Sequence, residues 1–115
     1  MTPDSWSILK IDRAGEIVYK VFAGWAGGYL YGDSWKLNSG IQSYKENADS
    51  VDMNGYSGSC YHLPFASEGR HTAYNFGILN SIMDNAKVAG VEIKVISLQQ
   101  FFTEFKEKQL YNGET

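Results

Sequence analysis

Apolar and polar residues alternate with a period of two through the first half of the chain, a pattern that is typical of β-strands. The alternating runs between Trp6 and Leu63 are short, and turn residues such as those at 12–15 separate them. Both faces of 16–22 are largely apolar, which predicts a strand at the centre of its sheet. In 35–42, one face is apolar and the other is polar. The first half of the chain therefore predicts an antiparallel meander.

The turn residues set the boundaries of the expected strands. Asn54-Gly55 separates two of the runs, and this dipeptide favours a type I′ hairpin because both central residues of that turn take positive φ. A β-branched run near the C-terminus adds one more strand. The strands that we expect span 6–11, 16–22, 29–31, 35–42, 50–54, 56–63 and 91–96.

Two helices are expected after Arg70, where the period changes to about three and a half. The first begins near Thr72 and ends at Gly90, a left-handed C-terminal cap, and Gly77 inside it suggests a close crossing over the sheet. The second begins after Ser97, whose hydroxyl can accept from the Gln100 amide while the Gln100 side chain reaches back. The stripe of the first helix consists of Asn75, Ile78, Leu79, Ile82, Ala86 and Ala89.

A run of strands followed by helix, strand and helix predicts an α+β fold. We expect a mostly antiparallel sheet of about six or seven strands, covered on one face by two C-terminal helices. The sequence has 115 residues and no internal repeat, so residues 1–115 are predicted to form a single α+β domain.

The net charge and the cysteine content limit which partners and which cellular location we expect. The net charge is −3 and the ten basic residues are scattered, which argues against nucleic-acid binding. Cys60 is the only cysteine, so no intrachain disulfide can form, and a reducing, cytoplasmic location is expected. No run approaches the roughly 20 apolar residues of a membrane span. We expect neither a cofactor nor a bound metal.

The segment 24–41 combines glycines with large aromatic side chains more densely than any other part of the chain. The aromatic residues of the chain outnumber what one small core can hide, which predicts that some pack against a second subunit, another protein or a small ligand. Ser57-Gly58-Ser59 is a candidate backbone nest for an anion or a carbonyl. The candidate binding surface consists of Trp25, Tyr29, Asp33, Trp35, Asn38, Ser57, Ser59 and Tyr61.

An alternative site involves Cys60, His62 and His71. Cys60 and His62 are two apart on an expected strand, so their side chains share a face, with Cβ atoms roughly 6–7 Å apart. A thiol beside an imidazole is the minimum for cysteine catalysis or for part of a zinc site. This pattern leaves open a small cysteine-dependent enzyme.

Several stretches of the chain resemble small uncharacterised bacterial proteins of integron cassettes, prophages and genomic islands. They are 24–29, 32–41, 55–61 and the Tyr74-Asn75 pair ahead of Ile78-Leu79. Some proteins of this group are similar in fold to the mitochondrial acidic protein p32, which has an antiparallel sheet with flanking helices and forms ring-shaped oligomers. The isolated strand expected at 91–96 departs from that fold.

These observations lead to one main hypothesis and two alternatives. The main hypothesis is a non-enzymatic accessory or binding protein of a mobile genetic element, which forms homo-oligomers through its aromatic, Gly-rich sheet face. The alternatives are the cysteine-dependent enzyme and a module that sequesters a small molecule such as a nucleotide or a sugar.

Overall fold

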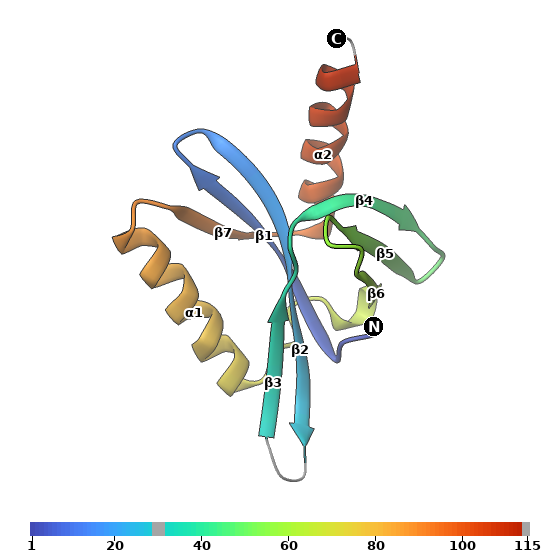
Figure 1. The fold of residues 1–115 in the computed structure, drawn as a ribbon. Helices are drawn as coiled ribbons and strands as arrows, with labels where there is room; N and C mark the ends of the chain where they lie inside the picture. Colours follow the sequence, from blue (N-terminus) through green and yellow to red (C-terminus); the bar gives the residue numbers. More distant parts are fainter. Residues whose placement is uncertain (29–31, 114–115) are drawn as a thin grey trace.

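The computed structural model describes residues 1–28 and 32–113, with side chains described for 1–27 and 33–106 (Figure 1). In these residues the chain forms strands, one short 3₁₀ helix and two α-helices. The elements are β1 (Ser5–Arg13), β2 (Glu16–Gly28), β3 (Gly32–Leu37), β4 (Ile41–Glu46), β5 (Ser50–Gly55), β6 (Cys60–Pro64), the 3₁₀ helix (Phe65–Ser67), α1 (Ala73–Val88), β7 (Glu92–Ile96) and α2 (Leu98–Gly113). The strand expected at 29–31 lies outside the described residues.

The strands form two sheets rather than the single sheet that the alternation predicts. One sheet has the order β3-β2-β1-β7 and the other has the order β4-β5-β6, and all neighbours are antiparallel. The chain leaves the first sheet at Asn38, whose side-chain Oδ1 accepts from the Val21 amide in place of a backbone carbonyl. Gly40 then takes a φ of 127° and redirects the chain into β4. The expected strand at 35–42 is therefore divided between two sheets.

The α-helices pack on opposite faces of the four-stranded sheet, which corrects the expectation that both cover one face. In Figure 1, α1 lies on one side of the sheet, while α2 and the three-stranded sheet lie on the other. Leu9 and Phe22 face α1, whereas Ile8 and Val21 face the three-stranded sheet and α2. Because β1 and β2 carry apolar residues on both faces, each face requires its own cover.

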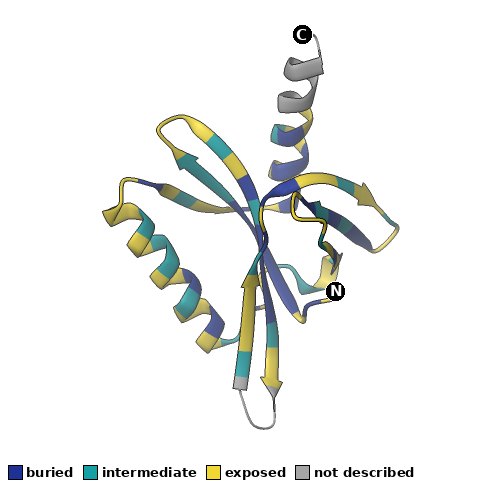
Figure 2. Ribbon diagram, viewed as in Figure 1, coloured by how far each residue is buried: buried dark blue, intermediate teal, exposed yellow. Residues whose placement is uncertain are grey.

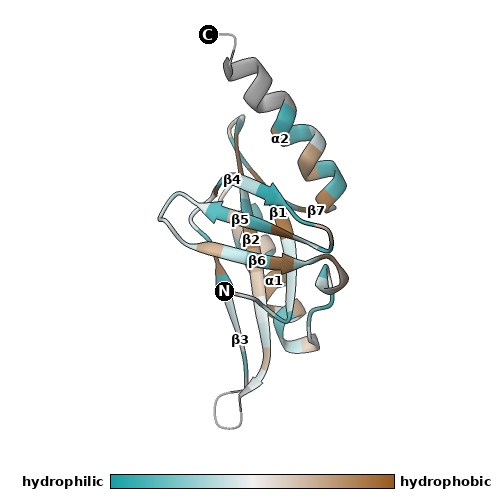
Figure 3. Cartoon of the chain, turned by 90° about the vertical axis from the view of Figure 1, so that its right-hand side faces the viewer, coloured by the Kyte–Doolittle hydropathy of each residue, from teal (hydrophilic) through white to brown (hydrophobic). Residues whose placement is uncertain are grey.

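Consecutive buried residues run along the central strands at 5–9 and 21–24, as Figure 2 shows for β1 and β2. β2 lies between β1 and β3, so its prediction as a central strand is confirmed. Figure 3 shows hydrophilic and apolar residues alternating in the three-stranded sheet, as expected for strands with one covered face. The main core combines both sheets with the first turns of α2, including Trp6, Ile8, Val21, Met53, Leu63 and Phe101.

Two tight turns were expected, and one of them is displaced. The β1–β2 turn falls at Ala14 and Gly15, with φ values of 52° and 89°, as predicted. The β5–β6 turn does not fall at Asn54-Gly55, because Gly55 still pairs with Ile41 in β4. The chain turns instead between Gly55 and Ser59, whose backbones are joined by a hydrogen bond of 2.8 Å.

The helix ends follow the sequence signals. Thr72 caps α1 by accepting from the Asn75 amide at 3.2 Å, and Gly90 beyond its C-terminus has a φ of 80°. Ser97 accepts from the Gln100 amide at 3.1 Å, as predicted for α2, but the Gln100 side chain donates to Glu104. Gly77 has nothing near the position of a Cβ atom, so the predicted close crossing there is wrong.

Candidate binding surfaces

A row of four rings runs between β3 and the start of α1, and we call it the aromatic row. The Trp35 ring stacks on buried Phe22, with centroids 5.7 Å apart. Phe22 contacts the His71 ring edge-on at 5.2 Å, and His71 contacts Phe76 in the same way at 5.3 Å. Trp35 is 39% exposed and Phe76 is 43% exposed, so both ends of the row reach the surface. Tyr74, also exposed, lies on the same turn of α1.

His71 is fixed in this row by two serine hydroxyls from β1. Its Nδ1 atom lies 2.9 Å from Ser5 Oγ, and its Nε2 atom lies 2.7 Å from Ser7 Oγ. A neutral imidazole has one donor and one acceptor, and the two hydroxyls satisfy both. Burial lowers the pKa of His71 below its ordinary value. All three residues are buried, so the two serines hold the His71 ring of the aromatic row in place inside the protein.

Asp33 and Asn75 hold the neighbouring backbone. The Asp33 carboxylate accepts from the Gly27 amide at 2.7 Å, across the irregularity in the β2–β3 pairing. Its pKa is lowered by hydrogen bonds from Thr72 and from Gly27. Asn75 is fully buried and donates to the Ser34 carbonyl at 3.1 Å, which ties α1 to β3. These hydrogen bonds therefore fix the β3 backbone immediately before Trp35, to β2 through Asp33 and to α1 through Asn75.

A cluster of three hydroxyls lies where the chain passes between the sheets. Ser39 Oγ donates to Ser57 Oγ at 3.1 Å and accepts from the Ser57 amide at 2.9 Å. Ser57 Oγ also lies 3.4 Å from Ser59 Oγ. The Ser57 and Gly58 amides are both used within this region, so the expected backbone nest is occupied by the protein's own acceptors.

Asn38 borders this cluster and is buried. Its Oδ1 atom accepts from the Val21 and Gly40 amides, at 2.9 and 3.3 Å. Its Nδ2 atom is buried without a hydrogen-bond partner among the described residues. A Cβ atom built on Gly55 would lie 3.5 Å from this nitrogen and 3.1 Å from Ser39 Oγ, so the amide group and the hydroxyl cluster are adjacent.

The remaining residues of the predicted surface lie elsewhere. Trp25 packs against the main core, on the face opposite to Trp35, and its Nε1 donates to the Thr2 carbonyl at 3.2 Å. Tyr61 is buried in the three-stranded sheet, and burial raises its pKa. Tyr29 lies outside the described residues. The seven described residues of the prediction thus do not form one surface. Asp33 precedes Trp35 of the aromatic row on β3, and Asn38 borders Ser57 and Ser59 of the hydroxyl cluster.

A groove with a volume of about 470 Å³ lies between the C-terminal half of α1 and the β1–β2 hairpin. Lys20 and Ser39 line it together with the apolar residues, and Arg13 and Glu16 stand at the hairpin end. Sequence analysis did not identify this site. The available signal was Lys20, a lysine between Val18 and Phe22 on an apolar face of β2. The apolar lining consists of Ile11, Val18, Ala86, Ala89, Val91 and Ile93.

Cys60 and His62 share the outer face of the three-stranded sheet, but His62 pairs with a different residue. Its Nδ1 atom lies 2.6 Å from Asp52 Oδ1 on the neighbouring strand. The hydrogen bond from His62, with a second from Asn47, lowers the pKa of Asp52. His71 lies against the α1 face of the other sheet, so the structure does not bring the three residues together. Among the described residues, no group of three or more His, Cys, Asp or Glu side chains could hold a metal ion.

Comparison of the chain with protein-family models, with curated proteins and with solved structures found no match. Within the described part of the chain, neither helix is both long enough and apolar enough to cross a membrane.

Proposed function

We propose that this chain is a non-enzymatic binding protein that self-associates along β3, and that it serves as an accessory protein of a mobile genetic element. The observation that carries the proposal is the position of Trp35, an exposed ring on an edge strand that stacks on buried Phe22. A large ring held in one orientation loses little conformational entropy on binding, and Trp is enriched at binding hot spots. The separation of Cys60 and His62 from His71 supports a role without cysteine catalysis.

The edge position of β3 suggests how a second copy would bind. β3 ends the order β3-β2-β1-β7, so one side of it has no neighbouring strand among the described residues. The backbone groups of an edge strand readily pair with another strand. Antiparallel pairing of two β3 strands about a twofold axis at Trp35 would continue the sheet and bring both Trp35 rings to one face.

Charge and shape favour this register. Pairing centred on Trp35 sets Lys36 opposite Ser34 of the second copy, so the two lysines do not face each other. Phe76, at the other exposed end of the aromatic row, adds a second apolar ring on the α1 side of the sheet. These rings account for part of the aromatic surplus in the composition.

Sedimentation equilibrium of the full chain and of Trp35→Arg tests the proposal. We expect the wild-type chain to dimerise in the micromolar range, and the variant to raise the dimer dissociation constant by about 30-fold or more, the loss typical of a hot-spot residue. Phe65→Arg is the matched control, because Phe65 is similarly exposed but lies after the three-stranded sheet. A monomeric wild-type chain at high micromolar concentration, or equal effects of the two variants, would contradict self-association through β3.

A further inference from the structure

The groove beside α1 has an apolar floor supplied mainly by the sheet. Ile11, Val18 and Ile93 come from three adjacent strands, and Ala86 and Ala89 form the α1 side. Because alanines cover little of the sheet, this half of α1 leaves apolar surface open, and Val18 is 38% exposed. A volume of about 470 Å³ falls within the range of small-molecule sites.

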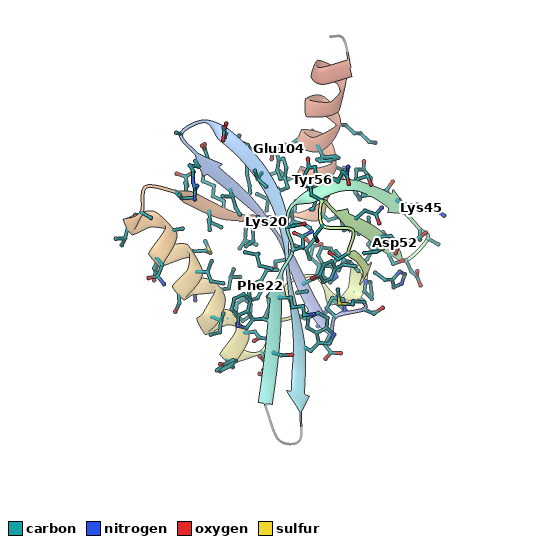
Figure 4. The ribbon with its side chains drawn as sticks, viewed as in Figure 1. Lys20, Phe22, Lys45, Asp52, Tyr56 and Glu104 are labelled. Atoms are coloured by element: carbon teal, nitrogen blue, oxygen red, sulfur yellow. The ribbon has the colours of Figure 1, made fainter. Side chains whose placement is uncertain are left out.

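One charge in this groove has no counterpart. Lys20 is half-buried on the α1 face of β2, and it makes no ion pair among the described residues. Arg13 and Glu16, at directly opposed positions in the β1–β2 register, also line the groove, and their formal charges cancel in the sum over the lining residues. An ammonium group that is partly removed from water is stabilised by an anion beside it. The lining of the groove therefore carries one net positive charge beside its apolar floor, and Lys20 is labelled in Figure 4.

A polar residue from the junction between the two sheets, Ser39, also lines this groove. Asn38 pairs with Val21 on β2, and this pairing holds the following residue, Ser39, beside the Lys20 segment of the strand. Ser39 lines the groove, and its hydroxyl joins the hydroxyl cluster. Because the Ser39 proton is donated to Ser57, the donor that remains for an anion is the Lys20 ammonium, and an ammonium beside an apolar floor suits a ligand with an anionic head and an apolar body.

We propose that this groove binds a small amphipathic carboxylate. The Lys20 ammonium holds the carboxylate, and Val18, Ile11 and Ile93 contact the hydrocarbon body. The site is independent of self-association, because it lies at the C-terminal half of α1 whereas the aromatic row lies at its start.

Titration of the full chain with octanoate, octanol and octylamine, followed by NMR of the backbone amides, tests this site. The three probes share an alkyl chain and differ in the charge of the head group. We expect octanoate to bind at least tenfold more tightly than octanol, with shifted amides in β2 and the C-terminal half of α1, and octylamine to bind most weakly. Equal affinities for octanoate and octanol, or no binding of octanoate, would overturn the proposal.

Substitutions in the groove, with one control outside it, localise the effect. Lys20→Met keeps an apolar stem and should reduce octanoate affinity to that of octanol, while octanol affinity stays within twofold. Ala86→Trp fills the groove and should abolish binding of both, with Ala89→Trp as a second filling variant if the first unfolds. Lys45→Met, on the three-stranded sheet, is the matched control and should change neither affinity. Unchanged octanoate binding in folded Lys20→Met or in a folded filling variant would also overturn the proposal.

Discussion

His71 Nε2 lies 2.7 Å from the hydroxyl of Ser7, in the buried layer between the four-stranded sheet and α1. Together with Ser5 on the other ring nitrogen, this contact fixes the imidazole so that Phe22 and Phe76 pack against it. A protonated imidazole has two donors and no acceptor, and it would have to remain charged inside an apolar layer. The folded structure therefore favours the neutral form of the His71 imidazole.

The first prediction is that the protein loses stability as the pH falls below about 6.5, the ordinary pKa of histidine. Burial lowers the pKa of His71 in the folded state, so in that range the unfolded chain binds more protons than the folded one. The stabilising contribution is fully present above the unfolded pKa and is lost as the pH falls toward the folded pKa. Urea unfolding at several pH values from about 7.5 to about 5.5, a range of about one unit on either side of the ordinary pKa, measures this loss of stability.

His71→Gln isolates this effect, because glutamine keeps polar groups near both hydroxyls but does not titrate. We expect the variant to be less stable than wild type at pH 7.5, a value about one unit above the ordinary pKa, and to show a flatter pH dependence. His62→Gln is the control, since His62 is exposed and pairs with Asp52 on the other sheet. An unchanged pH slope in His71→Gln would contradict the assignment.

The main strands could be predicted from alternation alone, whereas the division into two sheets could not. Ile41 continues the alternation that begins at Trp35, so nothing in the local pattern marks a break. The break arises because the Asn38 side chain bonds to Val21, which is 17 residues away. A side chain that replaces a backbone carbonyl leaves no trace in the hydrophobic pattern.

The candidate sites illustrate the same limit. The spacing of Cys60 and His62 correctly predicts that they share a face, because that follows from the strand period alone. The environment of His71 depends on Ser5 and Ser7, which are 66 and 64 residues away. Lys20 was visible as a charge within an apolar face, but only the fold reveals the groove around it.

The second prediction concerns two glycines with opposite surroundings. A Cβ atom on Gly24 would lie 2.7 Å from both Asn75 Nδ2 and Ser5 Oγ, within the buried layer that supports the aromatic row. We expect Gly24→Ala to reduce the free energy of unfolding by about 2 kcal/mol through overpacking. Gly77 in α1 faces open space, so Gly77→Ala should increase it by about 0.5–1 kcal/mol. Thermal and urea unfolding measure both changes, and effects of the same sign would contradict this account.

The third prediction concerns Glu104, which connects α2 to the sheet. It accepts from Lys10, from Tyr19 at 3.1 Å and from Gln100 at 2.7 Å. Burial raises the pKa of Glu104, but these hydrogen bonds together with the charge of Lys10 outweigh burial and leave the pKa below its ordinary value. Its contribution to stability is therefore present above about pH 4.5 and is lost as the pH falls through the folded pKa.

Glu104→Ala should accordingly lower the free energy of unfolding by about 2 kcal/mol at pH 7, because the charge-assisted hydrogen bond from Lys10 is lost together with those from Tyr19 and Gln100. The difference from wild type should shrink in acid, where the wild-type carboxylate is protonated. Glu92→Ala is the control: its partner Lys94 is exposed, so its effect should stay below about 0.5 kcal/mol. Equal losses in the two variants at pH 7 would show that Glu104 acts as an ordinary surface charge.

The fourth prediction concerns Asn38, at the point where the chain passes from one sheet to the other. Asn38→Ala removes the acceptor of the Val21 amide and leaves that buried N–H unpaired, which should lower the free energy of unfolding by about 2 kcal/mol. Asn54→Ala is the matched control, because Asn54 donates only to Ser43 at an exposed position and should lose less than about 0.5 kcal/mol. Amide hydrogen exchange adds a local readout: in Asn38→Ala the Val21 amide should lose protection more than the amides of β5 and β6. If protection fell uniformly, the Asn38 side chain would stabilise the whole fold and not the junction between the sheets in particular.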